Sequence, residues 1–138
     1  MKPDPLAEGR RWLLQAEHDL DDARYAEAGA RYSLACFLAQ QAAEKALKGY
    51  LYARGADAVL GHSVADLCDE AGRHDVELGK LKAEAGPLDR YYIQTRYPNS
   101  LPGGIPAEVF DRDDAEKALR VADRVIGVVR QKLGKASE

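Results

Sequence analysis

The sequence has few of the residues that build disulfide scaffolds, metal centres or membrane anchors. Its only cysteines, Cys36 and Cys68, lie far apart and form no Cys-x-x-Cys pair, which argues against a disulfide framework and a thiolate zinc site. No apolar run approaches the roughly 18–20 residues that span a bilayer, and the N-terminal segment has no signal-peptide pattern. We therefore expect a cytoplasmic protein that does not enter a membrane.

Positive charge is also scarce. Twenty lysines and arginines stand against 23 aspartates and glutamates, so the net charge is −3 at pH 7. The whole chain creates no positive field that could coat nucleic acid in the manner of a histone or a ribosomal protein. A local basic patch is still compatible with this balance.

β-branched residues are few, whereas strong helix formers are abundant. The chain has 8 valines and 3 isoleucines against 23 alanines and 16 leucines. Alanine and leucine favour helices, and β-branched residues favour strands, so the composition predicts an all-α fold. A length of 138 residues suits one domain with its own core. We therefore expect a single domain over residues 1–138, with a core over about 5–134.

Proline, glycine and capping residues divide the chain into predicted helices. These helices span about residues 5–28, 31–54, 63–72, 75–95 and 111–133. Asp4 and Pro5 form a typical helix start. Gly79, Gly86 and Pro87 are expected to split or kink the fourth helix. Residues 96–106 are rich in proline and glycine, which predicts a loop, and the tail over 135–138 is expected to fray.

The second predicted helix is apolar nearly all round in its first half. A helix with this pattern lies in the middle of a bundle or at a subunit interface. Small residues also follow one of its sides, which lets a neighbouring helix approach closely. These residues are Ala35, Ala39, Ala42, Ala46 and Ala53.

The basic aromatic segment, residues 89–98 (DRYYIQTRYP), is the most unusual stretch. It contains Arg90 and Arg96 together with Tyr92 and Tyr97, and no acidic residue occurs between Arg90 and Ala107. Guanidinium groups match phosphate, and tyrosine rings stack on bases, so these four residues are candidate nucleotide ligands. Alternatively, Arg96 bonds the carbonyls at a helix end and the tyrosines fill the core.

A polar stripe follows the second half of the second helix. It consists of Gln41, Glu44, Lys45 and Lys48 at helical spacing. The stripe is either a solvated, ion-paired face or the polar floor of a cleft. In the second case Lys45 and Lys48 are further candidate phosphate ligands.

The histidines offer no clear catalytic or metal site. His18 and Asp22 lie one helical turn apart, but two ligands do not make a metal centre. His62, Ser63 and Asp66 contain the residue types of a catalytic triad, yet neighbours in sequence rarely satisfy its geometry. We expect Ser63 to cap a helix and His62 to lie in a loop. Since phosphate-loop, dinucleotide and metalloprotease motifs are also absent, we predict no catalytic residue, metal or cofactor.

Four segments together resemble the HEPN domain family, named for higher eukaryotes and prokaryotes nucleotide-binding. They are AEHDLDDA (residues 16–23), QQAAEKALKGYL (40–51), GHSVADL (61–67) and LDRYYIQTRYP (88–98). The resemblance implies an up-and-down bundle of four or five helices. It also implies a homodimer with a cleft at the dimer interface.

The resemblance further implies a function linked to nucleotides. Small prokaryotic members are often encoded beside a minimal nucleotidyltransferase in what look like toxin–antitoxin or stress modules. Many members are metal-independent ribonucleases with an Arg-x4-6-His dyad on a late helix. Here no histidine follows His74, so that dyad is absent, and the spacing of Arg11 and His18 on the first helix is attributed to chance. We expect a dimeric nucleotide- or RNA-binding partner of a nucleotidyltransferase.

Two other hypotheses stay open at this stage. A divergent ribonuclease toxin would recruit His62 or His18 from elsewhere in the fold. A purely structural helper would use the tyrosines and the loop as a surface for protein contacts.

Overall fold

Residues 4–134 are described by a computed structural model, in which every regular element is a helix. The elements, including the short 3₁₀ helices η1 and η2, are α1 (Pro5–Ala28), α2 (Tyr32–Ala53), α3 (Val64–Gly72), α4 (Val76–Lys80), α5 (Lys82–Ala85), η1 (Gly86–Arg90), α6 (Tyr91–Gln94), η2 (Pro98–Ser100), α7 (Pro106–Val109) and α8 (Arg112–Leu133). The predicted all-α fold is confirmed. The tail over 135–138 lies outside the described residues.

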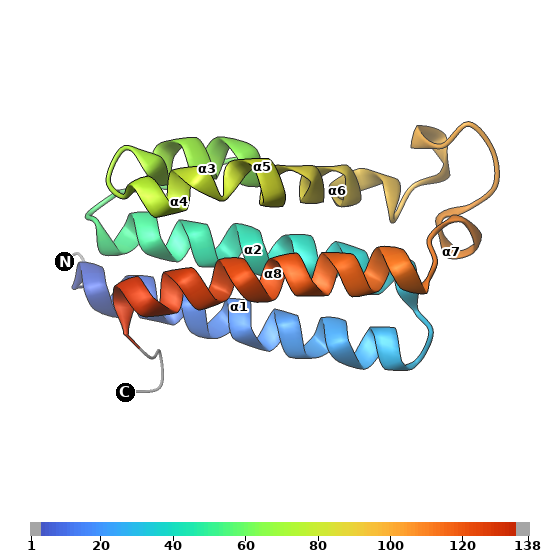
Figure 1. The fold of residues 1–138 in the computed structure, drawn as a ribbon, viewed down its shortest axis with the longest axis horizontal. Coiled ribbons are helices and arrows are strands. Elements are labelled where there is room, and N and C mark those ends of the chain that lie inside the picture. Colours follow the sequence, from blue (N-terminus) through green and yellow to red (C-terminus); the bar gives the residue numbers. More distant parts are fainter. Residues whose placement is uncertain (1–3, 135–138) are drawn as a thin grey trace.

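The bundle has α2 at its centre. α1 and α8 pack on α2 and on each other, and the chain from α3 to α6 covers the remaining side of α2 (Figure 1). α1, α2, the α4–α6 segment and α8 run alternately in opposite directions (Figure 1). This confirms the predicted up-and-down bundle. None of the helices between residues 4 and 134 has the length and apolar character needed to cross a bilayer.

α1 and α2 touch through their backbones near one end of the bundle. A Cβ atom added at Gly9 would lie 2.5 Å from the carbonyl oxygen of Gly49, and one added at Gly49 would lie 2.7 Å from that of Gly9. Only glycine permits this approach. The alanines predicted to line one side of α2 are buried as well, except for the partly exposed Ala53. The close packing expected from the sequence is therefore confirmed.

The predicted fourth helix is broken into α4, α5, η1 and α6. Gly72 and Gly79 lie so close that a Cβ on Gly72 would be 2.8 Å from the Cα of Gly79. Pro87 lacks a backbone N–H, and the chain tightens into the 3₁₀ helix η1 around it. The split expected at these residues is thus observed.

The expectation of a loop without helix over residues 96–106 needs a correction. Pro98 begins η2, and Pro106 begins the one-turn helix α7. Proline is favoured at a first helical position because its fixed φ suits the helix and its missing N–H would be unpaired there. The prolines that argued against a long helix therefore start two very short ones.

The carboxylate of Asp89 joins η1 to the N-terminus of α3. It accepts hydrogen bonds from the Ser63 hydroxyl (2.9 Å) and from the backbone N–H groups of Val64 (2.6 Å) and Ala65 (3.1 Å). Ser63 also caps α3 as predicted, since its Oγ accepts a hydrogen bond from the Asp66 N–H. We call this arrangement the Asp89 cap. A negative charge at a helix N-terminus is favourable, so the cap fixes the basic aromatic segment against α3.

We predict that Asp89→Ala lowers the free energy of unfolding by about 2 kcal/mol, because three donors at a helix start lose one charged acceptor. Asp89→Asn keeps one acceptor oxygen and should lose about half as much. Urea denaturation gives both values, and hydrogen exchange at the Val64 and Ala65 amides should accelerate. Asp21→Ala, which removes an exposed carboxylate, is the control and should change stability by less than about 0.5 kcal/mol. Equal losses for Asp21→Ala and Asp89→Ala would contradict the cap.

Candidate functional site

Arg96 lies on a platform of aromatic rings. Its Cζ is 4.3 Å from the ring centroid of Phe37, 4.9 Å from that of Tyr92 and 5.2 Å from that of Tyr97. Its Nε and Nη2 donate to the backbone carbonyl of Tyr92, the former at 2.8 Å. Among residues 4–134, no carboxylate forms an ion pair with Arg96, which is exposed. We call these four residues the Arg96 site.

The alternative interpretation of Arg96 holds in part, whereas its role as a nucleotide ligand stays a prediction. The guanidinium does bond a carbonyl at the end of α6, as the alternative proposed. It nevertheless stays at the surface, and its remaining N–H groups form no hydrogen bond within the described part of the chain. Cation–π contacts of this kind hold a guanidinium in place without neutralising it. The result is an oriented, exposed positive charge.

His62 lies beside the same platform. Its ring stacks on Tyr92 with centroids 4.6 Å apart and an angle of 17° between the planes. Its Nδ1 lies 3.4 Å from Oε1 and 3.5 Å from Oε2 of Glu44. The His62 side chain is 57% exposed, whereas that of Glu44 is only 4% exposed. A buried carboxylate thus holds one ring nitrogen of an exposed histidine.

Glu44 is the centre of a buried polar network on α2. Its Oε2 pairs with Lys48 Nζ at 3.2 Å, and its Oε1 accepts from the amide groups of Gln40 and Gln41, both at 3.4 Å. Gln40 also donates to the backbone carbonyl of His62 at 2.9 Å. A buried charge is tolerated only when it is paired and hydrogen-bonded, and Glu44 meets both conditions.

The stripe on α2 is therefore not a solvated face throughout. The Lys48 side chain is only 8% exposed, and its ammonium pairs with Glu44. Lys48 therefore lies beneath the surface, and its ammonium is not available as the phosphate ligand that the sequence suggested. The glutamate and the lysine form the polar floor beneath His62. The burial arises because α3, η1 and α6 all pack on α2.

Lys45 lies in a different place, in a pocket between α1 and α2. The pocket measures about 330 Å³ and is lined by Arg11, Trp12, Gln15 and Lys45; we call it the Trp12 pocket. The Lys45 ammonium pairs with the carboxylate of Asp19 at 2.7 Å.

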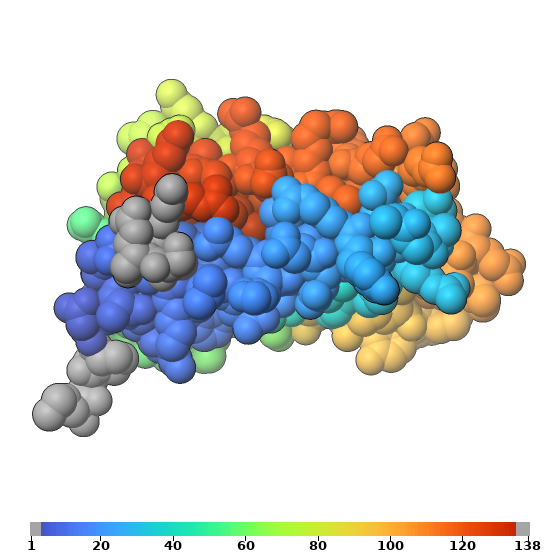
Figure 2. All heavy atoms as spheres, turned by 90° about the horizontal axis from the view of Figure 1, so that it is seen from below, coloured from blue at the N-terminus to red at the C-terminus, as the bar shows by residue number. Residues whose placement is uncertain are grey.

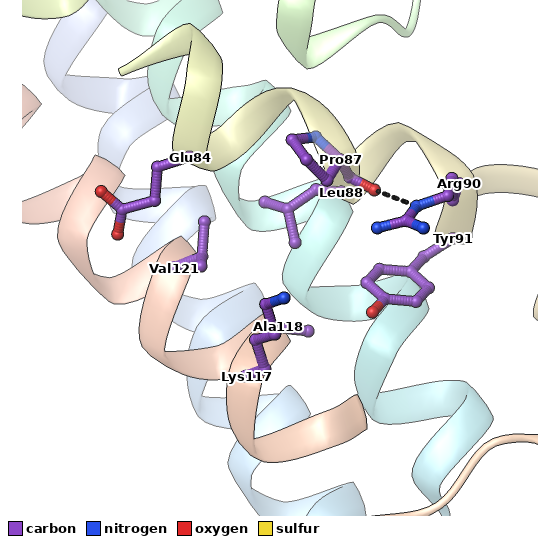
Figure 3. A pocket seen from close by; sticks show the side chains of 8 residues that line it. All are labelled: Glu84, Pro87, Leu88, Arg90, Tyr91, Lys117, Ala118 and Val121. Atoms are coloured by element: carbon purple, nitrogen blue, oxygen red, sulfur yellow. Dashed lines mark hydrogen bonds between the residues drawn. The ribbon is translucent and has the colours of Figure 1, made fainter. Parts of the chain in front are cut away.

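Arg90 is separated from Arg96. It lines a small pocket of about 20 Å³ between the η1–α6 segment and α8, together with Tyr91 and Lys117 (Figure 3). Its Nε donates to the carbonyl of Pro87 at 3.4 Å (Figure 3). Tyr91 meets the ring of Phe110 edge-on, whereas Tyr92 faces Phe37 and His62. Tyr91 and Tyr92 thus point to different parts of the molecule. Arg90 lies beside Tyr91, and Arg96 lies on the ring of Tyr92.

The structure therefore divides the six candidate ligands among four places. Arg96, Tyr92 and Tyr97 come together, Lys45 lies in the Trp12 pocket, Arg90 lies in the pocket against α8, and Lys48 is buried. The sequence did not predict a part for Phe37, and it predicted Glu44 only as a member of the polar stripe on α2. One signal was available for the glutamate, because Gln40, Glu44 and Lys48 recur at intervals of four residues.

Cys36 and Cys68 are buried free thiols. Burial raises the pKa of Cys36 and that of Cys68 to about 12 each. Since the thiolate is the reactive form, neither cysteine suits a nucleophile. His18 is exposed on α1, and no group of three or more potential ligands within residues 4–134 could hold a metal ion.

Comparison with known proteins gives a consistent result. The HEPN domain family matches residues 10–132. TT1696 from Thermus thermophilus is 43% identical, with a TM-score of 0.84 over 91% of this chain and 98% of its own. ST0689, an archaeal HEPN homologue, is 36% identical, with a TM-score of 0.75 over 96% of this chain and 99% of its own.

A third solved structure, the HEPN domain protein TM0613 from Thermotoga maritima, is 31% identical. Its TM-score is 0.70, and the match covers 89% of this chain and 97% of that one. No curated protein matches this sequence. The family match spans most of the chain, and the similar structures cover about nine-tenths of it or more with one fold. The chain therefore belongs to the HEPN domain family.

Proposed function

We propose that this protein binds nucleotides or RNA and acts in the cytoplasm as a dimeric partner of a minimal nucleotidyltransferase, in a module of the toxin–antitoxin or stress type. The observation that carries the proposal is the exposed guanidinium of Arg96, held by three rings and free of any ion pair within residues 4–134. A guanidinium binds phosphate oxygens in pairs. The adjacent ring of Tyr97, on a half-exposed side chain, offers a face for a base.

Binding without cleavage is the function that the residues favour. The chain has no histidine after His74, so the arginine–histidine dyad of nuclease members has no counterpart on a late helix. The Arg96 site still supplies charge and stacking, which suffice for recognition. In a protein of net charge −3, one focused cation directs an anionic ligand to one place.

A dimer is part of the proposal. Leu34 and Tyr25 are 48% and 85% exposed, and both line a groove of about 540 Å³ between the end of α1 and the start of α2. Exposed apolar side chains beside a groove are typical of protein contact surfaces. Phe37 of the Arg96 site lies one helical turn further along α2, so a partner seated in the groove would border the site.

A divergent ribonuclease is the second candidate, and one specific arrangement favours it. His62 and Arg96 flank the same tyrosine, and Glu44 holds His62 Nδ1. In this mechanism His62 Nε2 takes the proton of a ribose 2′-hydroxyl, whose oxygen bonds to phosphorus while the bond to the 5′-oxygen breaks and that oxygen takes a proton from water. Arg96 would stabilise the charge on the phosphoryl oxygens.

We predict that Arg96→Ala weakens binding of ATP or a short RNA by about tenfold or more, the loss expected for a charged phosphate contact. Arg96→Lys should recover only part of the affinity, because lysine lacks the planar fork. Isothermal titration measures both. Arg120→Ala removes an exposed arginine from α8 and is the control for net charge. If neither ligand binds the unmodified protein, the proposed function is wrong.

We predict that the protein has a mass of twice 15.1 kDa by light scattering and that Leu34→Asp returns it to a monomer. A buried, unpaired carboxylate would oppose association at the groove. Val76→Asp, at a position 68% exposed on α4, should leave the mass unchanged. A monomeric unmodified protein would remove the dimer from the proposal.

The proposed partner is tested by co-purification with a nucleotidyltransferase encoded beside this protein. Absence of a complex between the two proteins would exclude that partner.

We predict that, if the second candidate holds, purified protein cleaves RNA without added metal and leaves 2′,3′-cyclic phosphate ends. His62→Gln should lower the rate by about 100-fold or more, the usual contribution of a general acid–base group. Glu44→Gln should reduce it less and alter its pH profile, since Glu44 acts through His62. His18→Gln is the matched control. Intact RNA after prolonged incubation would leave binding as the function.

A further inference from the structure

A second aromatic and cationic cluster lies on the same side of α2 as the Arg96 site, and it consists of Trp12, Tyr52, Arg11 and Lys45. The two are connected along α2 by what we call the α2 stripe, which consists of Phe37, Gln41, Lys45 and Tyr52. At about 100° per residue they fall within an arc of about 80° on the helix. All four are partly exposed. In Figure 2, part of α2 is visible at the lower edge, between α1 and the yellow segment that contains α6.

The far end of this stripe carries its own stacked rings. Trp12 stacks on Tyr52 with centroids 5.2 Å apart and an angle of 26° between the planes. The hydroxyl of Tyr52 accepts a hydrogen bond from the Val59 N–H at 3.1 Å, which fixes the ring. Trp12 also lines the pocket of about 330 Å³ with Arg11 and Lys45. Rings and cations therefore occur together at both ends of the stripe.

The separation of the two clusters limits the ligand that could use both. Phe37 and Tyr52 are about 22 Å apart along the axis, from the helical rise of about 1.5 Å per residue. A mononucleotide or dinucleotide is too short to reach from one to the other. A single strand covers this distance with about seven nucleotides at a rise of about 3.4 Å each, and with fewer if it is extended.

We propose that the ligand of the Arg96 site is a single strand of nucleic acid that runs along the α2 stripe and stacks a second base on Trp12. The inference rests on the proposed function and extends its site. Lys45 would contact a phosphate between the two stacked bases, and Arg11 would contact a phosphate beside Trp12.

The charges along the stripe fit a ligand that depends on stacking more than on net attraction. Lys45 pairs with Asp19, Arg11 pairs with Glu8, and both pairs are at 2.7 Å. A strand that enters the Trp12 pocket therefore contacts two cations whose charges are already balanced by neighbouring carboxylates. With Arg96, Lys45 and Arg11 as the phosphate contacts, the logarithm of the affinity should fall with the logarithm of the salt concentration with a slope of about −2, and the aromatic rings should supply the part of the affinity that does not depend on salt.

Trp12 provides a direct readout, because it is the only tryptophan in the chain. We predict that an eight-nucleotide single strand quenches its fluorescence, whereas a dinucleotide that binds the Arg96 site leaves it unchanged. The Arg96→Ala variant should lose the quenching by the octamer at the same concentration. RNA and DNA octamers are compared, and the one that binds more tightly identifies the natural strand.

Substitution separates the second cluster from the first. Trp12→Ala should weaken octamer binding about five- to tenfold and leave dinucleotide binding unchanged, as expected for the loss of one stacked base. Trp12→Phe keeps a ring and should retain most of the affinity, and Lys45→Gln provides a variant that does not disturb the Trp12–Tyr52 stack. Circular dichroism confirms that each variant is folded.

Three results would overturn the inference. Octamer and dinucleotide could bind with equal affinity, the Trp12 and Lys45 variants could bind the octamer normally, or the dinucleotide could quench Trp12 even in Arg96→Ala. The first two would show that the ligand ends at the Arg96 site, and the third that the Trp12 pocket binds separately. In the first two cases Arg96→Ala would still weaken binding, so the proposed function would stand. Absence of binding by every ligand would instead remove the proposed function itself.

Discussion

The arrangement of the site depends on one carboxylate, that of Asp89 at the N-terminus of α3. His62 directly precedes Ser63, which donates to Asp89, and Tyr92 follows Asp89 by less than one helical turn. The cap therefore holds the chain at Ser63 against the chain at Asp89. This contact places the neighbouring residues His62 and Tyr92 close enough for their rings to stack. The broken helices between α4 and α6 have little regular structure of their own to hold this alignment. The hydrogen bonds of the Asp89 carboxylate hold this segment in place, as the backbone hydrogen bonds of one long helix would otherwise do.

Glu44 supports the same site from within α2. The carboxylate is buried, yet it is paired with Lys48 and hydrogen-bonded by two glutamines, so its charge is compensated before any ligand arrives. Its remaining partner is His62, the most exposed member of the network, whereas Gln41 is only partly exposed. The central helix of the bundle thus has two roles along adjacent sides. It fills the core with alanine and leucine, and it fixes the direction of an exposed imidazole.

Local features of the sequence predicted the fold well, and tertiary contacts explain what they did not predict. Helix starts at Asp4, Ser63 and Asp111 follow from capping chemistry that acts over three residues, so the sequence displays them. The burial of Lys48 and the separation of Arg90 from Arg96 depend on how α3 to α6 pack on α2 and α8. No spacing within one segment reveals such packing. For the same reason, Asp89 was visible only as an acidic residue beside a basic aromatic stretch.

The contact between Gly9 and Gly49 has a consequence for the surface. A Cβ atom at position 49 would lie 3.1 Å from the Cβ of Trp12, so the absence of this one carbon sets how closely the indole approaches Tyr52. Any larger residue there would displace α1 and widen the distance between the rings. Position 49 would then alter recognition without touching a ligand. In relatives that carry a side chain at this position, the pocket beside the tryptophan should have a different width, and ligand choice could diverge by a change made entirely inside the protein.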